Sequence, residues 1–361
     1  MHQKIAVLPG DGIGPEVTAQ ALRVLRMVES QFGYSFAYTF ADVGAIAIEQ
    51  HGDPLPEATL QVCLDADAIL FGAIGDPKYD NDPSAKVRPE QGLLRLRKSL
   101  GLFANIRPVT LYPTLAHLSP LKAEKLVGVD MVIFRELTGG IYFGEKGKTE
   151  DSAYDHCTYT ALEIERIARL AFTAAQTRRR KVTLVDKANV LETSRLWRII
   201  VQKISAEYPD VVLDWMYVDN AAMQLIQYPA HFDVLLTENM FGDILSDEAS
   251  VLPGSMGLLP SASVGARTAL FEPIHGSYPQ AAGQDIANPI AAILSAAMLL
   301  DSFQMTEAAD AVRNAVRRVL ENGNGTADLQ TATTLRCSEV GELICQEMSK
   351  LVTSYELSNN Q

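Results

Sequence analysis

Cysteine is scarce in this chain of 361 residues, and its few copies are too widely spaced to form a known metal-binding or redox motif. No C-x-x-C pair is present, and none of the spacings matches a zinc site. We therefore expect free thiols in a reducing compartment. The four cysteines are Cys63, Cys157, Cys337 and Cys345.

Long hydrophobic runs are also missing. The longest one, residues 290–300, is too short to cross a bilayer, which takes about 20 apolar residues. The first apolar segment, residues 5–8, begins after only four residues and ends in the turn Pro9-Gly10, so no signal peptide is expected. These features predict a cytoplasmic protein that does not contact a membrane.

Positive charge is in short supply, because 44 acidic residues outweigh 31 basic ones and leave a net charge of -13. A surface of this charge repels phosphate backbones and anionic lipids, so neither nucleic acid nor a membrane is an expected partner. We interpret the one basic run, residues 178–181, as a solvated helix end. An anionic substrate would need a local cluster of cations.

What the chain does contain is an α/β pattern, in which short apolar runs alternate with helical periodicity. The length exceeds that of one ordinary domain, so two lobes are expected. Several expected strands end at a charged residue, and ligands gather at the carboxyl ends of strands in open α/β sheets. The expected strands are residues 5–8, 68–71, 131–134, 182–185, 211–215 and 234–236.

Two aspartates, Asp243 and Asp247, follow one of these strands and are four residues apart. This spacing places both carboxylates on one helical face, where like charges destabilise a helix by a few tenths of a kcal/mol. A divalent cation that prefers oxygen ligands would explain the pair. The alternative is that acids in a first helical turn balance the positive end of the helix dipole.

Further charges stand at other strand and helix ends. Arg107 precedes a proline and Arg135 follows residues 131–134, and arginine binds carboxylates through two parallel hydrogen bonds. Lys187 stands at a strand end, where a partly desolvated lysine near cations can act as a base. Asp219 supplies a third carboxylate. With Arg97, these residues suit a metal-chelated polycarboxylate.

The expected helix at residues 90–98 presents Glu90, Leu93, Leu94 and Arg97 on one face, which suits an amphipathic ligand. The alternative is two core leucines flanked by charged side chains whose stems cover apolar surface. The preceding segment, residues 76–92, holds three prolines and predicts a mobile loop that acts as a lid.

Two glycine-containing segments are candidates for a nucleotide site. Residues 9–16 follow a strand and open a helix but do not form G-x-G-x-x-G, so the Rossmann fingerprint is absent. Residues 272–277, continued by residues 286–289, form the second candidate, because glycine and small polar groups let the backbone approach a pyrophosphate or adenine. Each segment has an alternative interpretation as an ordinary turn before a helix.

A third glycine pair, Gly139-Gly140, predicts a turn into a short aromatic strand at residues 141–144, with a polar continuation through Tyr154. Such an arm could pair with a second subunit.

Five segments together resemble the β-decarboxylating dehydrogenase family, in its isocitrate/isopropylmalate branch. They are residues 8–16, 92–98, 135–144, 186–190 and 239–248, and the likeness runs from residue 5 to about residue 343. The resemblance implies a two-lobed α/β fold with a mixed twisted sheet flanked by helices, and not a Rossmann fold. It also implies a discontinuous cofactor domain at residues 1–99 and 252–361, and a dimerisation, substrate and metal domain at residues 100–251 with an arm at about 139–155.

The chemistry that the resemblance implies is oxidative decarboxylation of a 2-hydroxy acid with NAD and either Mg²⁺ or Mn²⁺. Lys187 would accept the hydroxyl proton, and Tyr142, acidified by nearby cations, would return a proton to carbon. The metal ligands would be Asp219, Asp243 and Asp247. The substrate contacts would come from Arg97, Arg107, Arg135, Asp219, Leu93, Leu94 and Glu90.

The cofactor contacts implied by the resemblance include two departures from the family pattern. Gln280 stands where members that use NAD usually have an acid, and Tyr278 is bulkier than the usual alanine. Glutamine still hydrogen-bonds ribose hydroxyls and brings no positive charge for a 2'-phosphate, so NAD is favoured over NADP. The full set is Ile13, Asn189, Glu272, His275, Gly276, Ser277, Tyr278, Gln280 and Asn288.

The expected substrate is 3-isopropylmalate, whose oxidation is a step of leucine biosynthesis. The reason is that Leu93 and Leu94 stand where isocitrate relatives need polar groups. Burying an isopropyl group contributes about 2 kcal/mol, or roughly a thirtyfold preference. The alternatives are a sister enzyme acting on D-malate, tartrate or homoisocitrate, a metal-dependent lyase, and a non-catalytic dicarboxylate binder. The resemblance also implies a homodimer in which Lys187 and Asp219 serve the neighbouring subunit's site.

Overall fold

The computed structural model describes residues 2–80 and 87–359, and the chain forms two compact units. Unit 1 comprises Met1–Leu100, Tyr112–Leu118 and Ser255–Gln361, and unit 2 comprises Gly101–Leu111 and Ser119–Gly254. The chain therefore passes from unit 1 to unit 2 between residues 100 and 101 and returns between residues 254 and 255. The expected domain boundaries were at 99/100 and 251/252. The short segment at residues 112–118, which the sequence had placed in the other domain, belongs to unit 1.

The strands of unit 1 form a mixed sheet in the order β2-β1-β3-β12-β11. Strand β1 pairs in parallel with β2 and β3, β12 is parallel to β3, and β11 is antiparallel to β12. The strands expected at residues 5–8 and 68–71 are confirmed and lie at the centre, where both faces are buried. The bounds are β1 His2–Gly10, β2 Ser35–Phe40, β3 Ala68–Ala73, β11 Pro260–Val264 and β12 Ala269–Pro273.

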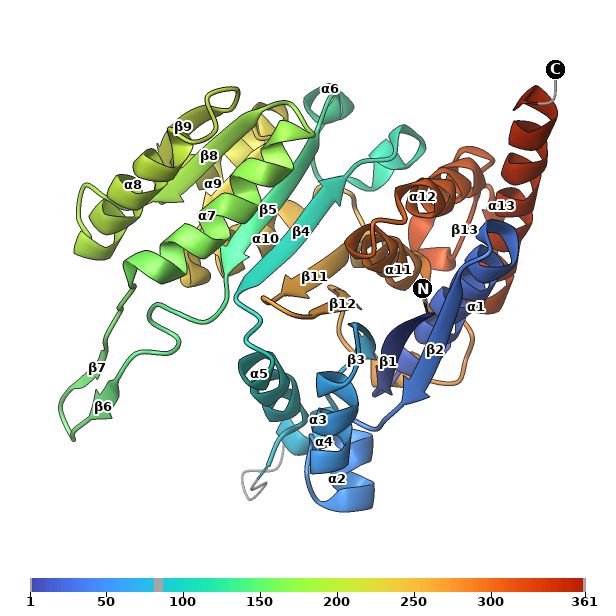
Figure 1. Ribbon diagram of the computed structural model, residues 1–361, viewed down its shortest axis with the longest axis horizontal. Coiled ribbons are helices and arrows are strands. Elements are labelled where there is room, and N and C mark those ends of the chain that lie inside the picture. The colour runs from blue at the N-terminus through green and yellow to red at the C-terminus, as the bar shows by residue number, and fades with distance from the viewer. Residues whose placement is uncertain (1, 81–86, 360–361) are drawn as a thin grey trace. The chain divides into compact units, whose positions relative to one another are not determined.

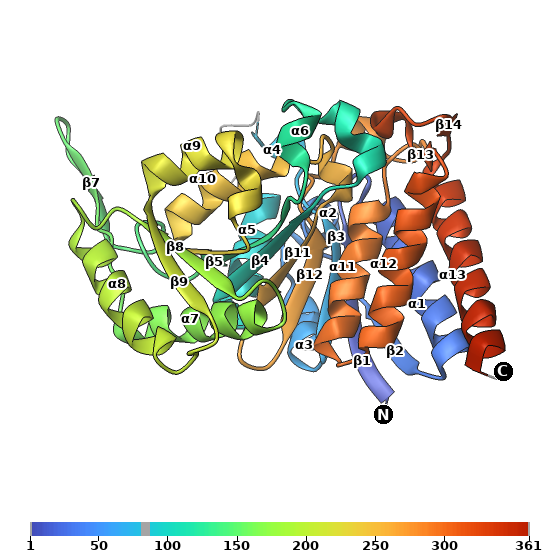
Figure 2. The same ribbon diagram turned by 90° about the horizontal axis from the view of Figure 1, so that it is seen from above.

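Four long helices of unit 1 pack beside one another, as Figure 2 shows. They are α1 Gly14–Phe32, α11 Ile290–Ser302, α12 Thr306–Glu321 and α13 Cys337–Asn359. Helix α11 is buried almost all round, which explains the apolar run at residues 290–300. No helix in the described ranges is long and apolar enough to span a bilayer. Unit 1 also contains α2 Ala45–His51, α3 Glu57–Leu64, α4 Pro77–Asp80, α5 Pro89–Ser99, the 3-10 helices η1 Pro113–Leu118, η3 Met256–Leu258, η4 Pro279–Ala281 and η5 Ala327–Leu329, and short strands β13 Asn324–Gly325 and β14 Thr333–Thr334.

The strands of unit 2 follow the order β4-β5-β10-β8-β9. All neighbours are parallel except β4 and β5, which pair antiparallel. The expected strands are present here too, although β9 begins one residue later than residue 211. The bounds are β4 Ala104–Thr110, β5 Asp130–Glu136, β8 Lys181–Asp186, β9 Val212–Tyr217 and β10 Val234–Thr237.

Helices cover both faces of the strands of unit 2 (Figure 1). Val234 and Leu236 of β10 pack with the core beneath α7 and α8, whereas Leu235 between them packs with the core beneath α9 and α10. Because successive strand residues point to opposite faces, a strand covered on both sides reads as a continuous apolar run. The helices are α6 Ala123–Leu126, α7 Ala161–Gln176, α8 Glu192–Ser205, α9 Val218–Gln227, α10 Asn239–Ser250 and the 3-10 helix η2 Pro229–His231.

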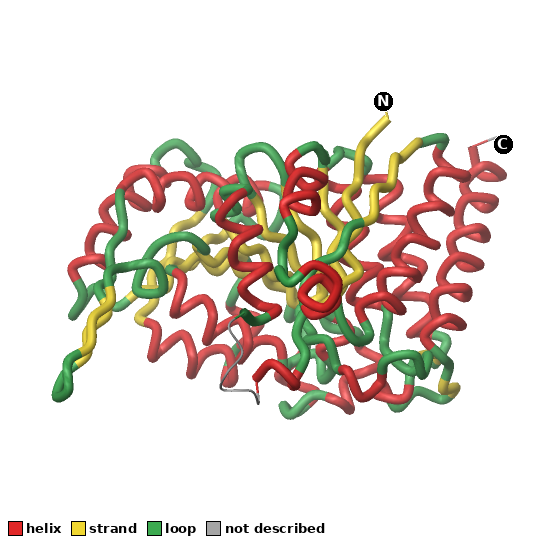
Figure 3. The backbone as a smooth tube through the Cα atoms, turned by 90° about the horizontal axis from the view of Figure 1, so that it is seen from below, coloured by secondary structure: helices red, strands yellow, loops and turns green. Residues whose placement is uncertain are grey.

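The aromatic strand expected at residues 141–144 is wrong, because this segment is a turn. The backbone N–H groups of Phe143 and Gly144 both donate to the Gly140 carbonyl, at 3.2 and 3.1 Å, and Gly140 has a φ of 77° that favours glycine. A Cβ on Gly144 would lie 1.7 Å from the His156 carbonyl oxygen. Strand pairing begins later, in the hairpin of β6 Lys146–Lys148 and β7 Ala153–Asp155, which projects from unit 2 (Figures 1 and 3).

The segment expected to act as a lid, residues 76–92, contains two helices. Helix α4 occupies Pro77–Asp80, and α5 begins at Pro89. Residues 81–86, on which the lid prediction mainly depends, lie outside the described residues.

Candidate functional site

Helix α10 carries both aspartates that the sequence singled out. It begins at Asn239, with Glu238 as its N-cap residue, so Asp243 and Asp247 lie beyond the first turn. The interpretation that they balance the helix dipole in a first turn is therefore wrong, because that effect falls off within one turn. Both side chains reach solvent, with 36% exposure for Asp243 and 71% for Asp247.

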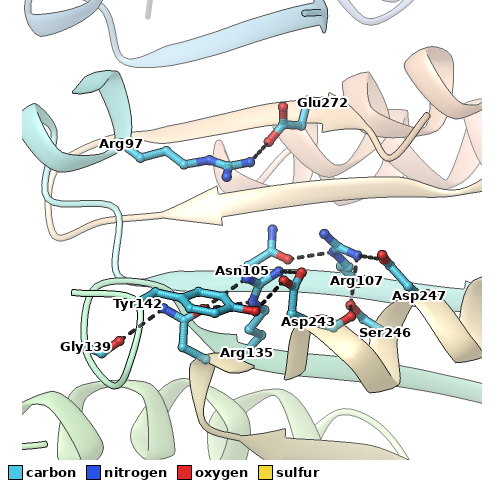
Figure 4. Close-up of polar contacts among 11 residues, drawn as sticks. Arg97, Asn105, Arg107, Arg135, Gly139, Tyr142, Asp243, Ser246, Asp247 and Glu272 are labelled. Atoms are coloured by element: carbon cyan, nitrogen blue, oxygen red, sulfur yellow. Dashed lines mark hydrogen bonds and ion pairs between the residues drawn. The ribbon is translucent and has the colours of Figure 1, made fainter. Parts of the chain in front are cut away.

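Two arginines on neighbouring strands reach these carboxylates, as Figure 4 shows. Arg107 of β4 places Nη1 2.6 Å from Asp247 Oδ1 and 2.8 Å from the Ser246 hydroxyl. Arg135 of β5, which is buried, pairs through Nη1 with Asp243 Oδ1. Unit 2 thus brings two expected carboxylate-binding cations and two expected metal ligands into one cluster.

Tyr142 completes this cluster by donating a hydrogen bond from its hydroxyl to Asp243 Oδ2 at 3.0 Å (Figure 4). Burial and the Asp243 carboxylate raise the pKa of Tyr142 above its ordinary value of 10, although Arg135 acts in the opposite direction. Among the groups of the chain itself, burial and Asp243 therefore outweigh Arg135, and acidification of this hydroxyl by nearby cations stays a prediction. A phenol that keeps its proton at neutral pH is suited to donate it.

Lys187 and Asp219 form a second pair in the same unit, with Nζ 2.6 Å from Oδ1. Asp219 stands in the first turn of α9, directly after β9, and the hydrogen bond from Lys187 lowers the pKa of Asp219. The sequence predicted cationic neighbours for Lys187. Its contacts are instead this carboxylate and the Tyr217 ring, whose centroid lies 6.0 Å from Nζ.

The backbone beside Lys187 is held by buried polar contacts. The buried Asp186 carboxylate accepts hydrogen bonds from Arg198 Nε at 2.6 Å and from the Ala188 N–H at 2.9 Å. The Lys187 N–H itself donates to the Ser194 hydroxyl at 3.0 Å. These contacts fix the end of β8, so the half-buried side chain of Lys187 extends from a rigid base.

The three aspartates implied as metal ligands do not converge within one chain. Among the described residues, only Glu16, Asp285 and Cys337 place three His, Cys, Asp or Glu ligand atoms within 4.8 Å of one another. Asp243 and Asp247 nevertheless offer carboxylate oxygens on one helical face, and this donor set fits a hard cation such as Mg²⁺ or Mn²⁺.

The two glycine-containing segments of unit 1 lie against each other. The Ile13 N–H donates to the Ser277 carbonyl at 2.7 Å, and a Cβ on Gly12, whose φ is 59°, would lie 2.0 Å from the same oxygen. Glu16 of α1 accepts hydrogen bonds from the N–H groups of Gly283 and Asp285. The sequence predicted two separate nucleotide candidates, and the structure joins them into one loop cluster.

The side chain of Asp11 holds this loop cluster together through hydrogen bonds from the backbone. Its buried carboxylate accepts hydrogen bonds from the N–H groups of Ala45 at 2.9 Å, Ile46 at 3.1 Å and Gly75 at 2.9 Å. Burial raises the pKa of Asp11 even though these three donors favour the ionised form. A buried acceptor with three backbone donors ties the loop after β1 to the loops after β2 and β3.

Among the other cofactor candidates, His275 has one ring nitrogen that is available for a hydrogen bond to a cofactor. Its Nδ1 lies 2.9 Å from the Gly276 carbonyl, whereas its buried Nε2 has no partner in the described part of the chain. Burial lowers the pKa of His275 below 6.5, so the imidazole is neutral at pH 7. Asn288 is committed elsewhere, since its amide donates to Asp328 at 3.1 Å and accepts from the Ile290 N–H at 3.0 Å.

The remaining cofactor candidates are mostly on the surface. Tyr278 is 56% exposed and has a φ of 39°, in the left-handed region. Glu272 is buried and accepts a hydrogen bond from Arg97. The exposed ones are Gly276, Gln280 and Asn189, the last in unit 2, while Ser277 and Ile13 are buried.

The two leucines of α5 that were expected to face a ligand differ in their exposure to solvent. Leu93 is 9% exposed and shares the buried face with Leu96, whereas Leu94 is 55% exposed. The core interpretation therefore holds for Leu93, and Leu94 is the one available to a ligand. Arg97 places Nη2 2.5 Å from Glu272 Oε1 (Figure 4), and Glu90 is exposed.

Sequence reasoning missed the polar side chains that hold the arginines. Asn105 accepts from Arg107 Nε at 2.7 Å, and Asn239 accepts from both Nε and Nη2 of Arg135. Ser246 also contacts Arg107. Both asparagines are buried. Asn105 stands two positions before Arg107 in the same strand, β4, whereas nothing in the sequence around Asn239 signals its contact with Arg135, about a hundred residues earlier.

The fold and the site define a dehydrogenase of the isocitrate/isopropylmalate class. Residues 4–344 match the family described as isocitrate/isopropylmalate dehydrogenase, and the chain belongs to this family. The 3-isopropylmalate dehydrogenase of Bacteroides fragilis is 57% identical over 330 residues, which cover 91% of this chain and 94% of the relative. That of Moorella thermoacetica is 55% identical over 355 residues, covering 96% and 99%. The crystal structure of a beta-decarboxylating dehydrogenase from Thermococcus kodakarensis, in its apo form, is similar with a TM-score of 0.84 and 38% identity over 98% of each chain.

Proposed function

We propose that this protein oxidises and decarboxylates 3-isopropylmalate to 4-methyl-2-oxopentanoate and CO2 with reduction of NAD, a step of leucine biosynthesis. The observation that carries the proposal is the cluster in unit 2, where Arg107, Arg135 and Tyr142 meet Asp243 and Asp247. It combines two carboxylate-binding cations, a proton donor and two metal-type ligands. The names of the relatives at 55% and 57% identity favour the same reaction.

Two bound groups would complete the site. Asp243 and Asp247 would hold Mg²⁺ or Mn²⁺ together with Asp219, since all three offer the oxygen ligands that these ions prefer. The unpartnered Nε2 of His275 and the joined loops at Ile13 suit a nucleotide such as NAD. When bound, the cation would polarise the substrate hydroxyl, and NAD would accept the hydride. The remaining NAD contacts would come from Gly276, Ser277, Tyr278, Gln280, Asn288, Glu272 and Asn189.

The side chains of this chain would bind the substrate and move its protons. Arg107 and Arg135 would bind its carboxylates, with Arg97 of α5 as a third cation. Lys187 would accept the proton of the 2-hydroxyl group as the bond between C2 and its hydrogen breaks. After CO2 leaves with cleavage of the carbon–carbon bond, the electron pair stays on the substrate carbon that carried the lost carboxylate. The Tyr142 hydroxyl would then donate a proton to that carbon.

The apolar side chains of α5 would select the substrate. Leu94 is exposed and would contact the isopropyl group, while the buried Leu93 would support it from beneath. An isocitrate carboxylate in the same place would lose its hydration without gaining a cation, which costs free energy. The exposed Glu90 nearby would further repel such a carboxylate.

A homodimer with shared sites would bring Asp219 to the other two metal ligands. Within one chain the three do not form a group, so a second copy would supply Lys187 and Asp219. Exposed apolar side chains on the outer faces of α9 and α10 suit such an interface. They are Met223 (52%), Ile226 (41%) and Ile244 (60%). The β6–β7 hairpin is a further candidate contact, and the four free thiols favour a reducing cytoplasm.

The test follows the absorbance of reduced nicotinamide with purified protein, 3-isopropylmalate and Mg²⁺, with NAD and NADP in parallel. Malate and isocitrate serve as competing substrates. We expect NADH only with 3-isopropylmalate. A signal with malate or isocitrate alone would move the protein to a sister activity, and no signal from a folded dimer would favour a lyase or a dicarboxylate binder.

A further inference from the structure

Asn239, the first residue of α10, has a buried side chain that links two parts of the site in unit 2. Its Oδ1 accepts hydrogen bonds from Nε and Nη2 of Arg135 at 3.1 and 3.0 Å. Its Nδ2 donates to the Gly139 carbonyl at 3.1 Å. Its backbone N–H donates to the Tyr159 hydroxyl oxygen at 3.0 Å, so both ends of the residue are held.

The orientation of this amide follows from the chemistry of its partners. A guanidinium only donates hydrogen bonds and a backbone carbonyl only accepts them, so Oδ1 must face Arg135 and Nδ2 must face Gly139. With its Nε and Nη2 edge held by Asn239, the guanidinium directs Nη1 to Asp243 (Figure 4). One edge of Arg135 is thus anchored, and the other reaches the cluster.

The second partner of Asn239 begins the turn that carries Tyr142. The Gly139 N–H donates to the buried Glu136 carboxylate at 2.6 Å, and its carbonyl accepts from Asn239. Three residues later, Tyr142 reaches Asp243, the same carboxylate that Arg135 contacts. Asn239 therefore closes a ring of contacts that runs through Arg135, Asp243, Tyr142 and the turn at Gly139.

We propose that Asn239 is a positioning residue for the reaction, which holds the Arg135 guanidinium and the Tyr142 turn in register around Asp243. The inference rests on the proposed function, because it takes Arg135 and Tyr142 as groups that touch the substrate. A neutral amide suits this role because it binds the guanidinium without adding a second negative charge to the one that Asp243 already supplies. A carboxylate in its place would offset the guanidinium charge further and repel the Gly139 carbonyl.

Two substitutions separate these contributions. Asn239→Asp keeps the shape and the contact with Arg135 but adds a negative charge, whereas Asn239→Ala removes both contacts and adds no charge. The matched control is Asn314→Asp on α12, where an exposed asparagine likewise accepts a hydrogen bond from an arginine, Arg317, at 2.7 Å. The three variants are compared with the wild type for kcat and KM with 3-isopropylmalate, NAD and Mg²⁺.

We expect Asn239→Asp to raise KM for 3-isopropylmalate by about tenfold or more, because the substrate carboxylate then competes with a second anion. Asn239→Ala should mainly lower kcat, again by about tenfold, because Tyr142 loses its fixed position. Asn314→Asp should match the wild type. An independent readout is the rise in melting temperature on adding 3-isopropylmalate with Mg²⁺, which should shrink in Asn239→Asp and persist in Asn314→Asp.

The outcomes distinguish this inference from the proposed function. A wild type that does not oxidise 3-isopropylmalate contradicts the proposed function. An active wild type with folded Asn239 variants whose kcat and KM stay within about twofold contradicts the inference alone. If Asn239→Asp does not fold, Asn239→Ser replaces it. Because serine adds no charge, kcat unchanged in that variant, or failure of all three to fold, shows that Asn239 serves the core only.

Discussion

The Lys187 ammonium and the Asp219 carboxylate lie 2.6 Å apart, although they follow different strands. Strands β8 and β9 are parallel neighbours with Asp186 opposite Tyr217, so the residues just beyond them meet at the same edge. Asp219 does not join Asp243 and Asp247 within one chain. If the proposed metal site needs all three carboxylates, a second copy must bring the Lys187–Asp219 pair to it.

Mixing two inactive variants tests this sharing of sites. Lys187→Gln and Asp243→Asn should each lower kcat by about 10²- to 10⁴-fold, because one lacks the base and the other a metal ligand. When the two are dissociated and reassociated together, half of the dimers are mixed and each mixed dimer has one intact site, so about a quarter of wild-type activity should return. NADH formation before and after mixing measures it.

The control for mixing pairs Lys187→Gln with Asp219→Asn, which remove residues of the same contributed pair. No mixed dimer then contains an intact site, so activity should stay low. Recovery in this control would show that Lys187 and Asp219 serve a site from different chains. No recovery with Asp243→Asn, despite exchange of subunits, would place each site within one chain.

Replacing Asp247 should weaken metal binding. Asp247→Asn removes one negative charge and one strong oxygen ligand, so the dissociation constant for Mn²⁺, measured by electron paramagnetic resonance, should rise by about tenfold or more. Chelation of the wild type should abolish activity, and Mg²⁺ or Mn²⁺ should restore it. The control is Asp210→Asn, an exposed carboxylate of unit 2 that contacts Gln176. Equal Mn²⁺ affinity of wild type and Asp247→Asn would exclude Asp247 as a ligand.

An acid at position 280 should improve the use of NAD. Gln280 is exposed in η4, and Gln280→Asp would supply a carboxylate that accepts hydrogen bonds from ribose hydroxyls and repels a 2'-phosphate. We expect KM for NAD to fall severalfold and KM for NADP to rise, measured by initial rates. Gln346→Asp on α13 is the control. If the ratio of the two KM values does not move, position 280 does not contact the ribose.

The buried Glu238 should make stability depend on pH. Burial, aided by the charge of Glu136, raises the pKa of Glu238 to about 7, above its ordinary 4.5, and its carboxyl lies 3.9 Å from the Cys157 thiol. The folded state therefore binds the proton more tightly than the unfolded state, so the free energy of unfolding falls as pH rises from about 5 to 7. Glu238→Gln cannot ionise and should gain on the order of 3 kcal/mol relative to wild type across this window.

Urea unfolding at about pH 5 and pH 8 measures this gain. Glu321→Gln, an exposed acid on α12, serves as the control and should show no such change. The interpretation of Glu238 is wrong if wild type and Glu238→Gln differ by the same amount at both pH values.

The strands and the helix of the two aspartates were predictable because their signals are local. In β5 and β10 every central side chain is buried on one face or the other, so the apolar run is visible in the sequence. The spacing of Asp243 and Asp247 likewise contains its own geometry, since a helix sets the angle between residues four apart.

Contacts that depend on packing between distant segments were not predictable. The turn at residues 141–144 is imposed by the close approach of Gly144 to His156, which overrides the strand preference of the aromatic residues. The contact of Lys187 with Asp219 depends on strand order, which no local pattern contains. The role of Asn239 depends on two segments about a hundred residues earlier in the chain.

Unit 1 is built from both ends of the chain, and this affects how the protein emerges from the ribosome. Strand β3 pairs with β12, with Ile69 opposite Leu270, and α1 packs against α13 at the far end of the sequence. Almost all of unit 2 lies between these partners. The middle of the chain can therefore fold while it is being synthesised, whereas the first hundred residues must wait with an unpaired apolar strand edge. The time during which this edge is unpaired is the stage of biogenesis most exposed to aggregation, and it is the natural point for a chaperone to act.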